Sequence, residues 1–275
     1  MPDRQPLAAF LRARRERLKP ADVGLAEGGR RRVAGLRREE VAMLAGISAD
    51  YYLRLEQGRT SQPSDQVLAA LASALQLSDD ATEYMRNLAR PALTRRSRVP
   101  ASAEDVDLGL RTLIDNWQLI PAYVQDRHMN VLVANSMAQA LLPYFAPGFN
   151  QLRTAFLDPD FPAWVDNWDE VTDMLVSWLR FNIAEDSPAD PEFQALIDEL
   201  SDASQQFRTL WARQEVKQKT SGPAPFQNPR VGPLALCYRV FMLPDTKQTM
   251  IAYYAEPGTP SEERLRELST LVHSP

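Results

Sequence analysis

The residues with the clearest chemical potential are arginines near the start of the chain, because a guanidinium group pairs bidentately with phosphate or with the edge of guanine. Residues 1–98 contain 18 Lys and Arg against 12 Asp and Glu, a net charge of +6, whereas residues 99–275 carry −11. The basic part is therefore suited to a polyanion such as DNA. An arginine-rich solvated surface without a partner explains the charge alone equally well.

The segment 36–59 predicts two short helices joined by a tight turn. Val41, Leu44 and Ala45 give the first helix an apolar side, and Gly46 suits the left-handed conformation that ends a helix. Ser48 is a good N-cap for the second helix. This arrangement is a helix-turn-helix, in which the early residues of the second helix face base edges in the major groove. A plain helical hairpin is the alternative, and the net charge of +6 disfavours it.

The residues expected to contact DNA form two groups. Those at the start of the second helix, which would face the bases, are Ser48, Ala49, Asp50, Tyr51 and Arg54. Those expected to contact phosphate, through side chains or through free N–H groups at a helix start, are Arg30, Arg31, Arg32, Arg37, Arg38 and Arg59.

Helical spacing predicts a compact all-helical region around this motif. The helices are expected at Leu7–Leu18, Arg38–Ala45, Ala49–Glu56, Asp65–Leu75 and Asp79–Ala89. Lys19–Gly35, which contains Gly28 and Gly29, is expected to be an exposed basic loop. The prolines and arginines of Arg90–Pro100 indicate a linker. We therefore expect a DNA-binding domain at 1–92, a linker at 93–103 and a second domain at 104–275.

Beyond residue 104 the pattern is that of an α+β domain. Strands are expected at Ala122–Gln125, Asn130–Ala134, Leu234–Leu243 and Thr249–Ala255. Helices are expected at Leu108–Trp117, Ser136–Phe145, Ala163–Ala184, Pro191–Leu200, Ala203–Val216 and Ser261–Val272. The segment Thr220–Pro233 carries four prolines and is expected to be a loop.

Several classes of function are disfavoured by composition. One cysteine, Cys237, and two scattered histidines, His128 and His273, predict no disulfide, no zinc site and no metal. Cys237 is expected to act as a small buried hydrophobe. No stretch approaches the roughly 20 apolar residues of a membrane span, so we expect no membrane contact and a cytoplasmic location. Because the common nucleophile, metalloprotease and nucleotide motifs are missing, we expect neither an enzyme nor a cofactor.

The chain resembles a known family at these residues. Ala42–Glu56 is similar to the XRE-type helix-turn-helix of bacterial repressors, a lambda-repressor-like fold. The string from Gly35 through Gly58, after a basic loop, resembles actinobacterial regulators that carry a MmyB-like ligand-binding domain. Further segments similar to that family are Ile120–Val124, Val131–Asn135, Phe207–Arg213 and Ala255–Pro260.

The resemblance implies a PAS-like second domain, with an antiparallel sheet and inserted helices enclosing an apolar chamber for a fatty-acid-like or other small ligand. Ligand pockets are mostly apolar with a few orienting polar groups. The residues expected to touch the ligand are Tyr123, Val133, Asn135, Phe156, Trp178, Arg180, Phe181, Trp211, Arg239, Phe241 and Tyr253. The expected protein is a ligand-responsive transcription regulator that binds double-stranded operator DNA as a homodimer.

Some roles stay open at this stage. Arg180 either pairs with a ligand carboxylate or forms an ordinary salt bridge, and Arg239 either lines the chamber or lies on the wet face of the sheet. Asn135, Trp211 and Arg213 either fix the fold or touch the ligand. The chain has Gln214-Glu215 and Asn228 where the family commonly has His-Asp and His. A second domain that serves only for dimerisation or partner binding is the alternative function.

Overall fold

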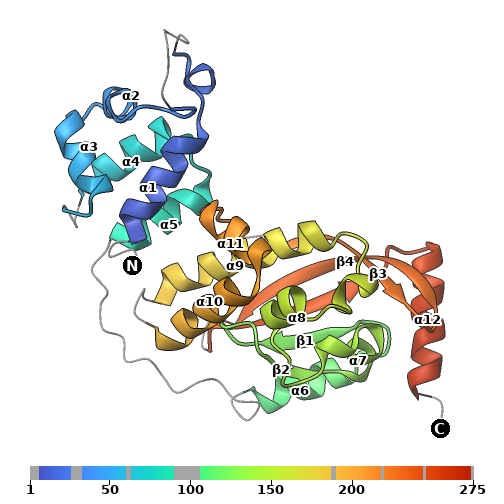
Figure 1. The fold of residues 1–275 in the computed structure, drawn as a ribbon. Coiled ribbons are helices and arrows are strands. Elements are labelled where there is room, and N and C mark those ends of the chain that lie inside the picture. The colour runs from blue at the N-terminus through green and yellow to red at the C-terminus, as the bar shows by residue number, and fades with distance from the viewer. Residues whose placement is uncertain are drawn as a thin grey trace. The chain divides into compact units, whose positions relative to one another are not determined.

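A computed structural model describes residues 6–25, 33–59, 63–89, 106–186, 190–217, 220–243 and 246–273 (Figure 1). The chain forms two compact units. Unit 1 comprises Met1–Arg95, Arg180–Asp190 and Thr209–Lys217, and unit 2 comprises Arg96–Leu179, Pro191–Arg208 and Gln218–Pro275. The expected linker at 93–103 lies outside the described residues.

The first part of unit 1 is all-helical, as predicted. Its elements are α1 (Pro6–Arg17), the 3-10 turn η1 (Pro20–Val23), α2 (Arg38–Leu44), α3 (Ala49–Glu56), α4 (Asp65–Ala74) and α5 (Asp79–Ala89). Each α-helix turns apolar side chains into one core, in which Phe10, Tyr52, Leu71 and Met85 are fully enclosed. Burying several large side chains in this way is the main source of stability for so small a helical group.

The segment Lys19–Gly35, expected to be wholly exposed, has buried ends. Pro20 is buried in η1, and Gly35 is buried against α1. A Cβ added at Gly35 would lie 2.3 Å from the carbonyl oxygen of Glu16, closer than any side chain tolerates. Glycine therefore lets the chain return to α1 here, where Leu36 donates a backbone hydrogen bond to Arg15 at 3.1 Å.

Unit 1 also contains two stretches from later in the chain. They include the end of helix α9 (Trp168–Asp186) and of helix α11 (Gln205–Ala212). Phe181 and Val216 join the same core as the N-terminal helices. Arg17 donates to the carbonyl of Arg213 at 3.1 Å and forms an ion pair with Glu215.

Unit 2 is built on one antiparallel sheet. Its strands are β1 (Ala122–Gln125), β2 (Val131–Ala134), β3 (Ser221–Asn228), β4 (Gly232–Leu243) and β5 (Gln248–Tyr254), in the order β2-β1-β5-β4-β3. All neighbouring pairs are antiparallel. The expected α+β class, with an antiparallel sheet and inserted helices, is confirmed.

Strand β3 corrects the expectation of a proline-rich loop at Thr220–Pro233. β3 is the last strand in the sheet and pairs with β4. Val240 N donates a hydrogen bond to Thr220 O at 2.8 Å, and this bond fixes which residues of β3 are hydrogen-bonded to β4 and which are not. Pro223 and Pro225 then fall at positions where an N–H would point away from β4, so the missing donors cost the ladder nothing.

Helices cover the two faces of the sheet unequally. Besides α9 and α11, the helices and 3-10 turns of unit 2 are α6 (Leu108–Asp115), α7 (Ser136–Leu141), η3 (Pro143–Phe145), α8 (Gln151–Leu157), η4 (Phe161–Trp164), α10 (Pro191–Ala203) and α12 (Pro260–His273). Apolar residues of α7, α8, α9 and α12 pack with one face, which includes Tyr123 and Tyr253. Ile114 of α6 packs with the other, which includes Val124 and Ala252.

Candidate functional site

The turn between α2 and α3 has the geometry that its residues predict. Gly46 adopts a left-handed φ of 65°, and its N–H bonds to Met43 O at 3.2 Å while Ile47 N bonds to Ala42 O at 3.0 Å. The Ser48 hydroxyl accepts a hydrogen bond from Tyr51 N at 3.1 Å, so it caps α3. Two helices are thereby held by a four-residue turn, Ala45–Ser48, as in a helix-turn-helix.

The leading edge of α3 lies at the surface. Ser48, Ala49, Asp50 and Arg54 are exposed and Tyr51 is partly exposed, whereas Tyr52 and Leu55 on the opposite side are buried in the core. Asp50 and Arg54 pair at 3.1 Å, one helical turn apart, with half or more of each side chain exposed. An exposed pair of this kind is weak, so it does little to hold Arg54 in place.

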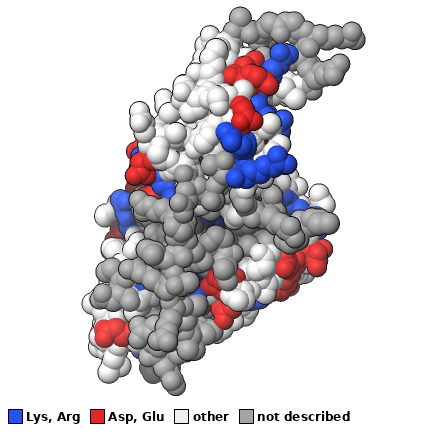
Figure 2. Space-filling model, turned by 90° about the vertical axis from the view of Figure 1, so that its left-hand side faces the viewer, with Lys and Arg blue, Asp and Glu red and all other residues white. Residues whose placement is uncertain are grey.

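Figure 2 looks from the side on which α2 and α3 lie in Figure 1 and shows basic atoms gathered in unit 1, beside acidic ones. Arg37 and Arg59 are both exposed. Arg30, Arg31 and Arg32 lie outside the described residues, so their phosphate contacts stay predictions.

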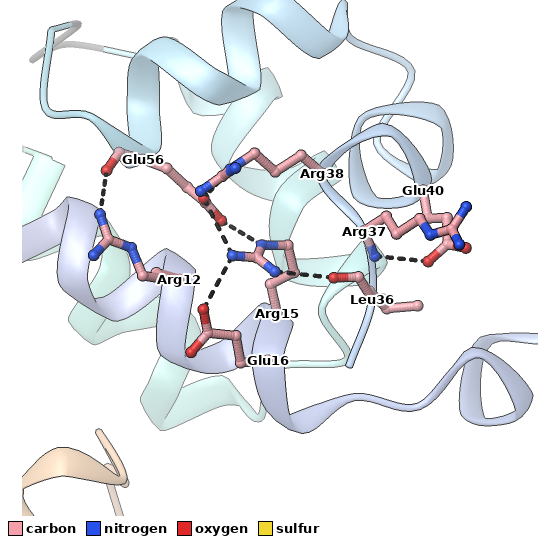
Figure 3. Close-up of polar contacts among 8 residues, drawn as sticks. All are labelled: Arg12, Arg15, Glu16, Leu36, Arg37, Arg38, Glu40 and Glu56. Carbon is pink, nitrogen blue, oxygen red and sulfur yellow. Dashed lines mark hydrogen bonds and ion pairs between the residues drawn. The ribbon is translucent and has the colours of Figure 1, made fainter. Parts of the chain in front are cut away.

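The opposite end of α3 is fixed by a buried carboxylate, as Figure 3 shows. Glu56, fully buried, pairs with Arg15 of α1 at 2.6 Å and with Arg38 of α2 at 2.6 Å. Arg12 donates to the Glu56 carbonyl at 3.3 Å, and Arg15 also donates to Leu36 O at 3.0 Å. The first three helices are therefore joined at a single residue.

The pKa values of this cluster follow from its contacts. Burial alone would raise the pKa of Glu56, but hydrogen bonds and charge from Arg15 and Arg38 outweigh it and lower that pKa. Burial disfavours the charged form of Arg15, but the hydrogen bond and charge of Glu56 raise its pKa overall. Glu56 is therefore ionised and Arg15 is charged, which makes this buried pair a fixed ion pair.

This network changes the role expected of Arg38. Its Nε is bound to Glu56, and 44% of its side chain is exposed, so Arg38 links the helices as well as facing outward. The backbone N–H of Arg37 donates to the carboxylate of Glu40 at 2.7 Å. An acidic side chain therefore already occupies the start of α2, which leaves the side chain of Arg37, and not its N–H, for a phosphate.

Unit 2 contains a cavity of about 140 Å³, formed within the unit by the sheet, η4 and α9. The aromatic residues that line it are Tyr123, Phe145, Phe161, Trp178, Phe226, Tyr238 and Tyr253. The rings of Tyr123 and Phe145 stack at 4.6 Å, and those of Phe145 and Tyr253 stack at 5.3 Å. Burial raises the pKa of Tyr123 and Tyr253, so both hydroxyls stay protonated.

The predicted ligand residues fall into separate places. Tyr123, Trp178 and Tyr253 line the cavity. Residues that do not line it but pack elsewhere in the cores are Val133, Phe156 and Phe181. Arg239 and Phe241 are exposed and alternate along β4 with Tyr238 and Val240, so they lie on the other face of the sheet.

Arg180 and Asn135 hold the structure together. Arg180 is 2% exposed, donates to Gln214 Oε1 at 2.6 Å and to Trp211 O at 2.5 Å, and lies 3.7 Å from the Trp211 ring centroid. Asn135 caps α7 and donates to the carbonyls of Ile114 and Ile120. The predicted ligand residues Arg180, Asn135 and Trp211 do not line the cavity.

The residues that stand where the family commonly has His-Asp and His also have structural contacts. Gln214 accepts the bond from Arg180, and Glu215 pairs with Arg17. Asn228 donates to the carbonyls of Ala140 and Leu141, each at 2.9 Å. Each position therefore has a partner of its own in this chain.

Sequence reasoning missed important walls of the cavity. Gln125, Met174 and Thr249 line it but carry no family signal and belong to separate elements. One available signal was the alternation of side chains along a strand: Gln125 lies two residues after Tyr123 and therefore points to the same face of the sheet. Helix α9 gave another: Val171, Leu175 and Trp178 follow helical spacing and line the cavity together.

The described residues contain no cluster of three or more His, Cys, Asp or Glu placed to hold a metal ion. Among those same ranges, no helix combines the length and apolar character needed to cross a membrane.

The exposed edge of α3 and the apolar cavity define a DNA-binding protein with a separate small-molecule domain. Residues 6–85 match a helix-turn-helix domain, and residues 106–268 match the MmyB-like transcription regulator ligand binding domain. The chain belongs to the family of MmyB-like transcription regulators. No curated protein matches it.

Proposed function

We propose that the protein is a ligand-responsive transcription regulator that binds operator DNA through α3 and a small, mainly apolar ligand in the cavity of unit 2. The exposed edge of α3, backed by the Glu56 network, carries the DNA-binding part. The match to a ligand-binding domain over 106–268 and the aromatic cavity within it support the ligand-binding part. A protein that acts on operator DNA works where that DNA is, so we propose a cytoplasmic location.

We propose that two copies act together on a palindromic operator. The reading edge of α3, meaning Ser48–Tyr51 together with Arg54, belongs to an eight-residue helix and is enough to contact a few base pairs. Two such edges, with half-sites about 34 Å apart, would supply the specificity that one edge lacks. Sedimentation of the protein with its selected operator tests this, since two protein chains per duplex are expected and one chain would contradict it.

Helix α9 is the element that we propose carries the response. Its residues Val171, Leu175 and Trp178 line the cavity in unit 2, and Phe181, one turn later, belongs to the core of unit 1. A ligand that binds one position of α9 more tightly than another shifts the population of DNA-binding forms.

The ligand-binding part is tested by filling the cavity. Ala224 lines the cavity from β3, so Ala224→Trp would occupy its space, whereas Ala235→Trp places the same ring at an exposed position of β4. Wild type and Ala235→Trp are expected to retain a small molecule through purification, detected by mass spectrometry of an extract, and Ala224→Trp to lose it. Equal recovery from both variants would contradict the cavity as the ligand site.

A further inference from the structure

We propose that Met129 determines how long a ligand the cavity of unit 2 admits, because its side chain limits the cavity on the side of the β1–β2 connection. The proposal rests on the ligand-binding function proposed above and assigns its size selectivity to one residue. It concerns the length of the apolar part of the ligand and is independent of the chemistry of its polar end.

Met129 lies where the cavity stops short of one edge of the sheet. The lining residues run across the sheet from β3, through β4 and β5, to β1, and no residue of the fully described strand β2 is among them. Met129 belongs to the connection between β1 and β2, is 1% exposed and lines the cavity. Gln151, which donates its backbone N–H to the Met129 carbonyl at 2.9 Å, lines the cavity as well. The side chain of Met129 therefore limits the cavity toward the β2 edge.

The backbone of Met129 has a conformation that methionine rarely adopts. Its φ is 67°, in the left-handed region, where the Cβ of any residue other than glycine crowds the following carbonyl oxygen. Such strain persists only where the surrounding structure fixes it, and it is concentrated at functional positions. A glycine would fit this turn without the strain. The chain keeps a long side chain here although the backbone disfavours it, which indicates a role for that side chain.

Two buried polar residues fix this turn. The carboxylate of Asp126 accepts hydrogen bonds from the backbone N–H and from the side-chain amide of Asn130, each at 2.9 Å. Asn150 donates from Nδ2 to the carbonyl of His128 and to Oδ1 of Asn130, each at 2.8 Å. Asn150 also caps α8, so the turn is joined to that helix. Met129 is therefore directed toward the cavity by a rigid connection.

Methionine limits a ligand through volume and apolar contact alone. Its unbranched thioether carries no charge and fills irregular space. Met129→Ala removes Cγ, Sδ and Cε and adds their space to the cavity of about 140 Å³. That space admits about two further methylene groups of a ligand, and each methylene that is buried strengthens binding roughly fourfold.

Straight-chain carboxylic acids measure the admitted length, since their series can be lengthened in regular steps. Calorimetric titration of the full chain with the even-numbered acids from hexanoate to hexadecanoate is expected to show affinity rising to an optimum length and then falling, because longer chains meet Met129. In Met129→Ala the optimum is expected to move to an acid about two carbons longer, and this acid is expected to bind the variant roughly tenfold more tightly than it binds wild type.

Two further variants separate the size of the cavity from the stability of the fold. Met137 is fully buried in the core of unit 2 and does not line the cavity, so Met137→Ala is expected to lower the melting temperature and leave the optimum length unchanged. Met129→Gly removes the same side chain and fits the left-handed turn freely, so it is expected to shift the optimum as Met129→Ala does. Its equilibrium constant for unfolding is expected to be roughly fivefold smaller than that of Met129→Ala.

The outcomes separate this inference from the function on which it rests. An optimum that stays at the wild-type length in both Met129 variants would overturn the role of Met129 and leave the ligand-binding function standing. A shift of the same size in Met137→Ala would overturn it too, since any lost core methionine would then have the effect. Binding of no acid by any of these proteins, together with no small molecule in an extract of the purified chain, would overturn both the inference and the function.

Discussion

The two ends of α3 are built for different tasks. Its first turn, Ser48–Tyr51, is largely exposed and is held by one cap, whereas its last residue, Glu56, is fully buried in a network with α1 and α2. A reading edge must meet DNA in a fixed orientation, and side chains that contact a partner cannot also anchor the helix. The arginines of the basic domain therefore divide into those that position α3, such as Arg15 and Arg38, and those that remain available to DNA.

The largest effect is expected where the anchor is removed. Glu56→Ala leaves Arg15, whose side chain is 6% exposed, buried without its carboxylate, so we expect a loss of about 3–5 kcal/mol in the free energy of unfolding. Asp50→Ala breaks the exposed pair with Arg54 and is expected to cost less than about 1 kcal/mol. Urea unfolding measures both, and equal losses would remove the distinction between the two ends.

The same network predicts a dependence of stability on pH. The pKa of Glu56 is lower in the folded chain than its ordinary value of 4.5, so its contribution is fully present above about pH 4.5. As pH falls below that value, the unfolded chain takes up the proton first, and the contribution is lost as pH approaches the folded pKa. Glu56→Gln is expected to flatten the unfolding free energy over this acid range, and a curve parallel to that of wild type would contradict the assignment.

The cap of α3 is expected to contribute less. Ser48→Ala removes the acceptor for Tyr51 N, at a cost of about 1 kcal/mol in unfolding free energy, and also disturbs DNA binding. Ser64 caps α4 in the same way, through Val67 N at 3.3 Å. Ser64→Ala is therefore expected to lose similar stability with DNA affinity unchanged. Equal DNA affinity of the two variants would show that the edge of α3 does not meet DNA.

The smallest effects are expected from single phosphate contacts. Arg37→Ala and Arg59→Ala should each reduce the slope of log affinity against log salt by about 0.9 for duplex DNA of any sequence. Arg86, exposed on α5, serves as the control and should leave the slope unchanged. A slope that falls equally in all three variants would indicate a diffuse basic surface instead of a docked helix. Arg38 is a poorer probe because it also stabilises the fold.

The two sites were unequally accessible to prediction from sequence. α3 is a local motif: a turn glycine, a cap and helical spacing lie within a few residues, and its bounds match the expected Ala49–Glu56. The cavity brings Gln125, Trp178 and Ala224 together from three elements, so only the folded sheet defines it. Strand β3 was missed because prolines disfavour strands in general. They are tolerated here because β3 is an edge strand and both prolines fall at positions that are not hydrogen-bonded to β4.

Charge was also an incomplete guide. Arg15 and Arg38 look like surface arginines in sequence, and nothing local indicates that Glu56, 41 and 18 residues later, pairs with them. The sequence also left open whether Arg180 binds a ligand or holds the fold, and its hydrogen bonds to Gln214 and Trp211 show that it holds the fold. Long-range partners of this kind need the fold before they can be assigned.

Selection of preferred duplexes from a random-sequence DNA library, with wild type and with Arg54→Ala in parallel, tests the central claim most directly. Arg54 is half exposed on the reading edge, and its replacement leaves the Glu56 network intact. We predict that wild type enriches paired half-sites about one helical turn apart, and that Arg54→Ala relaxes the preference at one position in each half-site. Enrichment of no sequence by wild type, or of an identical site by both proteins, would contradict the reading of DNA by α3.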